Sequence, residues 1–351
     1  MTIHRVQIGE RAVGHGHPCY LIAEAGVNHN GSLDLAMQLV DAAAAANADA
    51  VKFQTFAADR LASAAAPKAA CQLRTTDPEE TQREMLASLE LSADAHLSLR
   101  DRCHALGIEF LSSPFDEECA DFLEQMGLAA YKIPSGELTN LPFLAHVARK
   151  GKPLIVSTGM SSLGDVEAAV ETIESAGNRQ LVLLHCVSDY PATPSRANLR
   201  AMDTLAHAFG APVGYSDHTE GLTIALAAAA LGASVIEKHF TLDRSMRGPD
   251  HTTSLDPQDL AALVRGVRSI ESSLGDGRKT VTPGEMETAL AVRKSLVARV
   301  GIPAGVTITE SMLTVKRPGT GLSPTLRRQV LGRTARTDIA EDSLITLEML
   351  A

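Results

Sequence analysis

The segment PVGYSDHTEGLTIALAAAALGASVIEKHFTLD, residues 212–243, contains the pattern that decides the fold. Residues 212–219 and 234–243 are short apolar runs that end in polar residues, which is typical of buried strands. Residues 220–232 are rich in Ala and Leu and end in Gly, as helices often do. A strand, a helix and a second strand predict a βαβ unit, whose two strands lie parallel in one sheet.

The same pattern recurs throughout the first two thirds of the chain. Further strands are predicted at 19–26, 50–56, 109–115, 130–137, 153–160 and 181–190, and further helices at 33–47, 92–107, 116–127 and 163–177. Eight such units fit a (β/α)8 TIM barrel, an α/β fold of about 250 residues. The alternative, a doubly wound open sheet, usually has fewer strands. Residues 57–91 are longer than an ordinary βα loop, and we interpret them as a lid or substrate loop rather than a decorative insertion.

Length and composition exclude several classes of protein. The 351 residues suggest about two domains, and the net charge of −10 argues against a nucleic-acid partner. No apolar run is long enough to predict a membrane span, and the N-terminal MTIHRVQIGER has no signal-peptide core. The five Cys residues include no CxxC pair, which argues against a disulfide framework or a Cys-based zinc site. A cytoplasmic enzyme or a small-molecule-binding protein remains.

The composition changes after residue 275. We predict a barrel domain over 1–275, a linker rich in Gly, Pro and charge over 276–291, and a small β-rich module over 292–351. Within this module IPAGVTITESML, residues 302–313, resembles IAEDSLITLEML, residues 339–350. The repeat predicts two pseudo-symmetric halves.

Polar residues end every predicted strand, and in a barrel the carboxyl ends of all strands meet at one mouth. One cation and four hydroxyls lie at such ends: Lys52, Ser113, Ser135, Ser157 and Ser216. A positive charge with directional donors is what a phosphate group requires. The alternative for each serine by itself is a hydroxyl that caps a loop.

His218 and His239 end two successive predicted strands, 21 residues apart. Neighbouring strands would bring both imidazoles within reach of one ion, with positions left for water and substrate oxygens. This arrangement favours Mn²⁺ or Mg²⁺ over zinc in an open catalytic site. The alternative for a single strand-end His is a hydrogen-bonding role.

Acidic residues and two loops complete the predicted mouth. Glu24, Glu137, Glu237 and Asp250 could transfer protons or hold sugar hydroxyls. For Glu237 we prefer a salt bridge inside the barrel with Lys52 or Lys132. Residues 244–254 read as a loop over the mouth. In KRPGTGL, residues 316–322, an Arg precedes a rigid Pro-Gly turn, from which it could reach into a site.

At these residues the sequence resembles the sialic acid synthase family, over nearly the whole chain. The matching motifs are IAEAGVNHNG (22–31), VKFQTF (51–56), SSPFD (112–116), KIPSGE (132–137), STGM (157–160), SDHT (216–219), EKHFT (237–241), GPDH (248–251) and KRPGTGL (316–322). The C-terminal module resembles the family's antifreeze-like (SAF, β-clip) domain. The resemblance implies a TIM barrel, a divalent metal (Mn²⁺, with Mg²⁺ or Co²⁺ as alternatives) and a domain-swapped homodimer.

The resemblance also implies roles for individual residues. Phosphoenolpyruvate would be held by Lys52, Ser113, Ser135, Ser157 and Ser216, the metal by His218 and His239, and the amino sugar by Gln54, Tyr190 and Asp250. Arg317 would reach the sugar's N-acetyl group from the partner chain, and Glu24 and Glu137 would handle protons or position water. Two positions depart from the family pattern. SSPF replaces STPF and keeps the hydroxyl, whereas Ser188 stands where Asn is frequent, so we assign Ser188 no substrate contact.

The expected reaction joins phosphoenolpyruvate to an open-chain N-acetylated mannosamine-type sugar, giving a nine-carbon 2-keto acid and phosphate. The acceptor is either N-acetylmannosamine or a 2,4-diacetamido-6-deoxymannose, since residues 66–92 are similar to the insertion in both subgroups. Alternatives are a synthase for phosphorylated sugars, which would need a second phosphate cluster, and a non-catalytic sugar- or ice-binding protein, which would not need the His pair.

Overall fold

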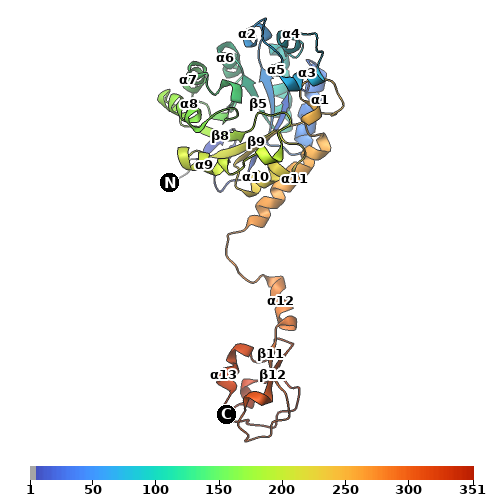
Figure 1. Ribbon diagram of the computed structural model, residues 1–351, viewed down its shortest axis with the longest axis vertical. Coiled ribbons are helices and arrows are strands. Elements are labelled where there is room, and N and C mark those ends of the chain that lie inside the picture. The colour runs from blue at the N-terminus through green and yellow to red at the C-terminus, as the bar shows by residue number, and fades with distance from the viewer. Residues whose placement is uncertain (1–4) are drawn as a thin grey trace. The chain divides into compact units, whose positions relative to one another are not determined.

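The computed structural model describes residues 5–351, except for the side chain of Cys71. The chain forms two compact units, divided between Gly275 and Asp276 (Figure 1). None of the helices within the described residues is long and apolar enough to cross a membrane.

The first unit is a TIM barrel. Its strands are β3 (Tyr20–Gly26), β4 (Ala50–Thr55), β5 (Glu109–Pro114), β6 (Tyr131–Ile133), β7 (Leu154–Ser157), β8 (Leu181–Cys186), β9 (Val213–Asp217) and β10 (Val235–His239). They form one parallel sheet in the order β5-β4-β3-β10-β9-β8-β7-β6. Because β5 and β6, the two ends of this order, lie side by side, the sheet is nearly closed. The eight predicted strands and the barrel are confirmed.

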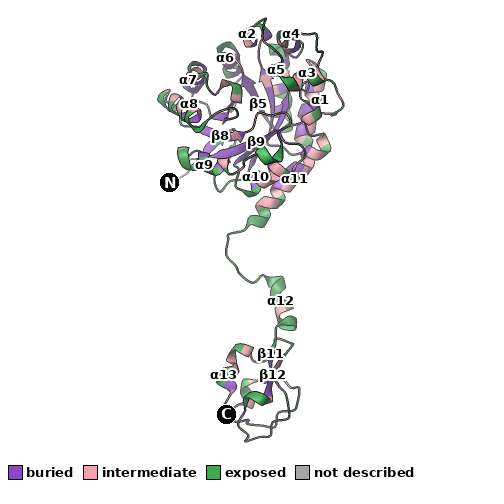
Figure 2. Ribbon diagram, viewed as in Figure 1, coloured by how far each residue is buried: buried purple, intermediate pink, exposed green. Residues whose placement is uncertain are grey.

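Helices surround this sheet and bury one face against it (Figures 1 and 2). They are α1 (Leu33–Ala45), α5 (Ala93–Leu106), α6 (Glu117–Gln125), α7 (Leu141–Arg149), α8 (Leu163–Ser175), α9 (Ala201–Phe209), α10 (Thr223–Ala230) and α11 (Pro257–Leu274). Side-chain caps fix where several begin; for example, Ser32 accepts a hydrogen bond from the Leu35 amide. The sequence pattern predicts five of these helices and misses α7, α9 and α11.

A hairpin that the sequence pattern does not predict closes one end of the barrel. Strands β1 (Val6–Ile8) and β2 (Arg11–Val13) pair antiparallel. Val6, Ile8 and Val13 are buried against barrel residues such as Tyr20 and Ile155. This apolar plug lies at the amino-terminal ends of the strands, so a polar site must be sought at their carboxyl ends.

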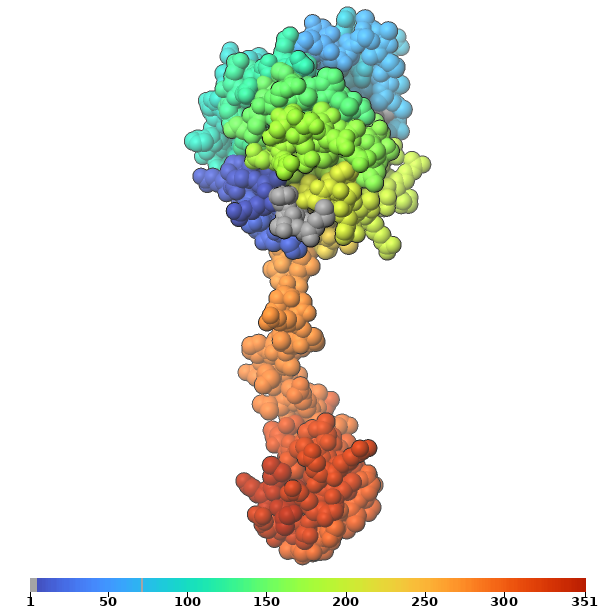
Figure 3. Space-filling view, turned by 90° about the vertical axis from the view of Figure 1, so that its left-hand side faces the viewer, coloured from blue at the N-terminus to red at the C-terminus, as the bar shows by residue number. Residues whose placement is uncertain are grey.

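The long insertion after β4 is folded. It contains α2 (Ala58–Leu61), α3 (Ala70–Thr75) and α4 (Gln82–Ala87). In Figure 3 this part of the chain, in light blue, stands at the surface of the barrel unit. Segment 57–91 is therefore a structured element rather than an extended loop.

The second unit has its own small core. It consists of α12 (Pro283–Val292), the antiparallel strands β11 (Ser295–Ala298) and β12 (Leu313–Lys316), and α13 (Arg327–Val330). The predicted repeat has a structural basis. Ile302 and Ile339, at the start of the two halves, exchange both backbone hydrogen bonds at 2.8 Å. Each half then forms a single 3-10 turn at the same offset, 310–312 and 347–349. The halves are thus pseudo-symmetric, and α12 occupies most of the segment predicted as a linker.

Candidate active site

A cavity of about 940 Å³ opens at the carboxyl ends of the barrel strands. Ten of the predicted site residues line it: Glu24, Lys52, Gln54, Ser135, Ser157, Tyr190, Ser216, His218, His239 and Asp250. They come from separate strands and the loops that follow them, so the parallel sheet is what brings these residues together. Residues of α3 and α4, as well as Pro249 of loop 244–254, also line the cavity.

The floor of the cavity is an ionic network inside the barrel. Lys52 Nζ is 2.8 Å from Glu24 Oε2 and 3.6 Å from Glu237 Oε2. Lys132 Nζ is 3.5 Å from Glu237 Oε1. The salt bridge predicted for Glu237 is confirmed, and it involves both lysines. Because all four side chains are nearly fully buried, removing any one would leave an uncompensated charge.

Burial and mutual attraction shift the pKa values of this network. Burial lowers the pKa of Lys52 to about 7, although the Glu237 carboxylate opposes the shift. Burial by itself would raise the pKa of Glu237, but the ammonium groups of Lys132 and Lys52 outweigh it and lower the pKa to about 2. Glu237 is therefore anionic near neutral pH, whereas Lys52 can change its charge there.

Hydroxyl groups surround the two lysines. Lys132 Nζ donates to Ser157 Oγ at 2.8 Å, and Ser216 Oγ donates to Glu237 Oε1 at 3.0 Å. Ser135 Oγ accepts a hydrogen bond from the Gly159 amide. Ser113 Oγ accepts from Lys52 Nζ at 3.2 Å, but Ser113 is fully buried and does not line the cavity. The structure thus places Ser113 behind Lys52 rather than on the cavity surface.

His218 and His239 lie side by side at the mouth, with ring centroids 5.5 Å apart. His218 Nδ1 donates to the Val187 carbonyl at 2.8 Å, which directs Nε2 to other partners. His239 Nδ1 is buried and has no hydrogen-bond partner among the residues that the structure describes. Burial and the neighbouring His218 hold the pKa of His239 well below its usual range, which favours the neutral, ligating form.

These features fit an open metal site with two imidazole ligands. Within the described residues no group of three or more His, Cys, Asp or Glu side chains is arranged as a metal cluster. Further ligands would have to be water or substrate, which is the pattern of a catalytic site. Asp250 Oδ2 is 3.9 Å from His239 Nδ1, and burial raises the pKa of Asp250 to about 6.

Other predicted residues complete the wall of the cavity. The Tyr190 ring lies against the His218 ring, with centroids 4.2 Å apart. Gly26, at the end of β3, marks where three side chains converge. A Cβ built on Gly26 would lie 3.0 Å from Glu24 Oε1 and 3.5 Å from both Gln54 Nε2 and His239 Cε1.

Besides Ser113, Glu137 does not line the cavity, and Arg317 belongs to the second unit. Glu137 lies in a 3-10 turn, Ser135–Glu137, where its carboxylate accepts from Asn140 Nδ2 at 2.8 Å and does not line the cavity. The strand stops at Ile133 because Pro134 has no N–H to extend the ladder, so Glu137 is not at a strand end as the sequence pattern suggests. Arg317 is exposed in the second unit, before Pro318.

The sequence analysis also misses several residues that line the cavity. They are Gln72, Arg74, Met160 and Cys186, among others. Lys132, predicted only as a possible ion-pair partner of Glu237, also lines the cavity. Arg74 connects the insertion to the opposite rim, since its Nη2 donates to the Tyr190 carbonyl at 3.3 Å.

Comparison with known proteins identifies two families along the chain. Residues 39–279 match the NeuB family, and residues 293–351 match the SAF domain. The N,N'-diacetyllegionaminic acid synthase of Campylobacter jejuni is 48% identical over 327 residues, 93% of this chain and 98% of the relative. The protein of the same name from Legionella pneumophila is 47% identical over 328 residues, 92% of both chains.

A solved structure is similar over most of the chain. The N-acetylneuraminic acid (sialic acid) synthetase from Leptospira borgpetersenii, in complex with citrate, gives a TM-score of 0.72 at 34% identity. The similarity covers 81% of this chain and 95% of that one. The relatives are thus similar to this chain in sequence, and the solved structure is similar in both sequence and fold.

Proposed function

Because this chain belongs to the NeuB family, we propose that it joins phosphoenolpyruvate to the aldehyde of an open-chain N-acetylated mannosamine-type sugar. Carbon 3 of phosphoenolpyruvate forms the new C–C bond, water adds to carbon 2, and phosphate leaves by C–O cleavage. The product is a nine-carbon 2-keto acid. The observation that carries this proposal is the single cavity in which a floor of lysines and hydroxyls adjoins the His pair.

The floor is suited to the anionic substrate. Lys52 and Lys132, with the hydroxyls of Ser135, Ser157 and Ser216, hold the phosphate and carboxylate of phosphoenolpyruvate and stabilise the charge that develops on the departing phosphate. Ser113 acts on this site only through Lys52. Glu24, on the cavity surface, positions the attacking water and accepts its proton. For Glu137, a role in proton transfer has no support from the position of its side chain.

We also propose that His218 and His239 bind a divalent cation, with Mn²⁺ as first choice and Mg²⁺ or Co²⁺ as alternatives. When bound, this ion supplies Lewis-acid polarisation of the aldehyde oxygen. The charges of the floor support its presence. The charges of two lysines and two glutamates cancel there. The negative charge of phosphoenolpyruvate therefore needs a further positive group nearby.

The acceptor would contact the remaining wall of the cavity. Gln54, Tyr190 and Asp250 offer an amide, a phenol and a carboxylate to its hydroxyls and its N-acetyl group. In a domain-swapped homodimer, as members of this family are expected to form, Arg317 of a second copy would contact the N-acetyl group. We expect the protein in the cytoplasm, because it would consume phosphoenolpyruvate, an intracellular metabolite.

A second acceptor is favoured by one specific observation. The two relatives at 47% and 48% identity are named for a product with two N-acetyl groups. A 2,4-diacetamido-2,4,6-trideoxymannose is therefore the alternative to N-acetylmannosamine.

Phosphate release from phosphoenolpyruvate tests both forms of the proposal. The purified chain would be assayed with Mn²⁺ and each acceptor in turn. Acceptor-dependent phosphate release is expected, and turnover with only one sugar identifies the product. If the folded, metal-loaded protein released no phosphate with either, the proposed reaction would be wrong, and phosphorylated sugars would be the next acceptors to assay.

A further inference from the structure

An apolar wall stands above one side of the charged floor. It consists of Val27, Met85, Leu86, Leu89 and Phe115, all of which line the cavity. Val27 and Phe115 follow β3 and β5, and the other three belong to α4 and the turn after it. Since the charged side chains of Glu24 and Lys52 come from within β3 and β4, the cavity is ionic at its floor and apolar at this rim.

The apolar wall is backed by a packed layer of side chains. Val27, Met85 and Leu89 form one buried cluster with Phe56. The rings of Phe56 and Phe115 meet edge to face, with centroids 5.9 Å apart. Leu86 packs against this cluster but is only partly buried. The wall is therefore fixed from behind, while Leu86 can contact a bound molecule.

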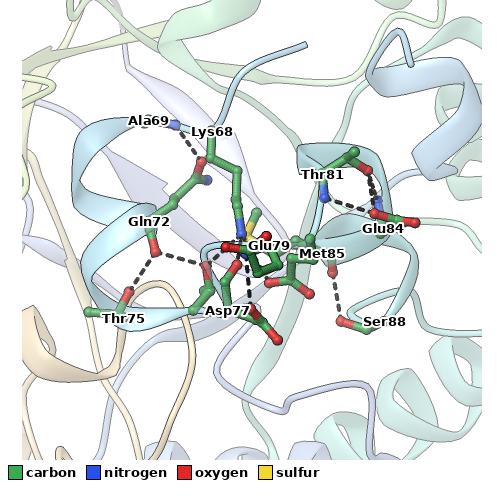
Figure 4. A network of polar contacts seen from close by, with 12 residues as sticks. Lys68, Ala69, Gln72, Thr75, Asp77, Glu79, Thr81, Glu84, Met85 and Ser88 are labelled. Atoms are coloured by element: carbon green, nitrogen blue, oxygen red, sulfur yellow. Dashed lines mark hydrogen bonds and ion pairs between the residues drawn. The ribbon is translucent and has the colours of Figure 1, made fainter. Parts of the chain in front are cut away.

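Lys68 holds the insertion together from inside. Its side chain is 2% exposed, and its Nζ is 3.2 Å from both Thr76 Oγ1 and Glu80 Oε1. It also donates to the Asp77 carbonyl. Figure 4 shows this ammonium at the centre of the polar contacts between α3 and α4. The buried ammonium group of Lys68 thus holds together the segment that places α4 beside the cavity.

Two further contacts fix α4. It begins with a capping box in which Thr81 Oγ1 accepts from the Glu84 amide and Glu84 Oε2 accepts from the Thr81 amide. The loop after β3 passes close to its end. At Gly31, with φ of +74°, a Cβ would lie 2.4 Å from the Ser88 carbonyl oxygen. Only glycine permits this approach, so the loop after β3 packs directly against the end of α4.

We infer that the apolar wall selects the acceptor by its non-reacting end, and that Lys68 is the positioning residue of this wall. The inference rests on the function proposed above, which puts the reacting aldehyde beside the His pair. The far end of an open-chain sugar then meets the wall. A methyl group fits there, whereas a hydroxyl or phosphate would lose its water without gaining a partner. The wall selects acceptors that end in methyl groups.

The test compares two acceptors that differ by one oxygen. N-acetylmannosamine and its 6-deoxy analogue would be assayed with phosphoenolpyruvate and Mn²⁺. The wild-type chain should prefer the 6-deoxy sugar by about tenfold or more in kcat/KM. Leu86→Asn should remove most of this preference by lowering kcat/KM for the 6-deoxy sugar about tenfold, with an unchanged KM for phosphoenolpyruvate. Leu73→Asn is the matched control, because Leu73 is exposed on α3 and does not line the cavity.

Variants at Lys68 test the positioning role. Lys68→Met should reduce the preference without changing the KM for phosphoenolpyruvate, and Lys68→Arg should restore part of it because it keeps a buried cation. Equal use of the two acceptors by the wild-type chain, or an unchanged preference in Leu86→Asn, would overturn the inference while the proposed reaction stands. Absence of phosphate release with every acceptor would overturn the proposed reaction, and the inference with it.

Discussion

Lys132 and Glu237 form an ion pair inside the barrel, with 3.5 Å between Nζ and Oε1 and both side chains almost fully buried. The same carboxylate lies 3.6 Å from Lys52 Nζ. Glu237 is therefore the shared partner of two ammonium groups at the base of the cavity, and Glu24 is a second partner of Lys52. This arrangement keeps both cations ready for an anionic substrate in a place where neither could be buried alone.

Replacing Glu237 should therefore cost stability as well as function. Glu237→Gln leaves two buried ammonium groups without their shared partner, and we expect the free energy of unfolding to fall by about 3–5 kcal/mol at pH 7. Because folding depresses the pKa of Glu237 from 4.5 to about 2, its stabilisation is present above pH 4.5 and lost as pH falls towards 2. Urea unfolding at several pH values measures the difference between the two chains.

An ion pair outside the cavity, between a buried carboxylate and a partly exposed guanidinium, provides the control for this variant. Asp49 pairs with Arg268 at 2.8 Å, and it does not line the cavity. Asp49→Asn should also lower the free energy of unfolding but leave the KM for phosphoenolpyruvate unchanged, whereas Glu237→Gln should raise that KM. Equal stability of Glu237→Gln and the wild-type chain at pH 7 would contradict the role given to this carboxylate.

Binding of phosphoenolpyruvate should weaken as pH rises through neutrality. Burial lowers the pKa of Lys52 to about 7, so the folded chain loses this positive charge above pH 7. We expect kcat/KM for phosphoenolpyruvate to decrease between pH 7 and about 9. In Lys52→Arg the guanidinium stays charged throughout, so the decrease should disappear even if the variant is less active. Parallel pH profiles for the two chains would remove Lys52 as the group that titrates.

The barrel could be predicted because each strand is a buried apolar run followed by polar residues. The same rule misses the hairpin of Val6–Ile8 and Arg11–Val13, since three-residue strands are too short to show a period. It also misses α7, although Asn140 caps this helix, Pro142 lies in its first turn and the buried residues Phe143, Leu144, Val147 and Ala148 follow a helical period. The alternation of strands and helices along the chain was thus easier to predict than the short elements.

Most predicted residues that line the cavity lie on a strand or soon after one, although Cys186 on β8 was not predicted to line it. The site was less predictable after the strand ends. Ser135 and Glu137 are two residues apart, yet the 3-10 turn directs Ser135 to the Gly159 amide and Glu137 to Asn140. The direction of a side chain in such a turn depends on local dihedral angles, which residue types do not determine. Which side chains of the insertion face the cavity likewise depends on tertiary packing, which residue types alone do not determine.

Removal of one imidazole should abolish tight binding of Mn²⁺. We expect His239→Asn to weaken the affinity by about 100-fold or more, since even partners that only support a ligand can contribute 10- to 100-fold. Titration calorimetry of the folded chain measures this without substrate. His185→Asn is the matched control, because His185 Nε2 donates to the Ala197 carbonyl and His185 does not line the cavity. Wild-type affinity in His239→Asn would exclude this imidazole as a ligand.

A single methyl group should obstruct the phosphoenolpyruvate side of the cavity. A Cβ on Gly159 would lie 2.2 Å from Ser188 Oγ and 2.8 Å from Ser135 Oγ, so Gly159→Ala must displace these hydroxyls. If Ser135 holds phosphoenolpyruvate, kcat/KM for this substrate should fall by at least about tenfold, while the affinity for Mn²⁺ should not change. Gly164→Ala meets only one atom, at 3.8 Å, and should behave as the wild-type chain. Normal phosphoenolpyruvate kinetics in Gly159→Ala, with the chain folded, would place the substrate away from Ser135.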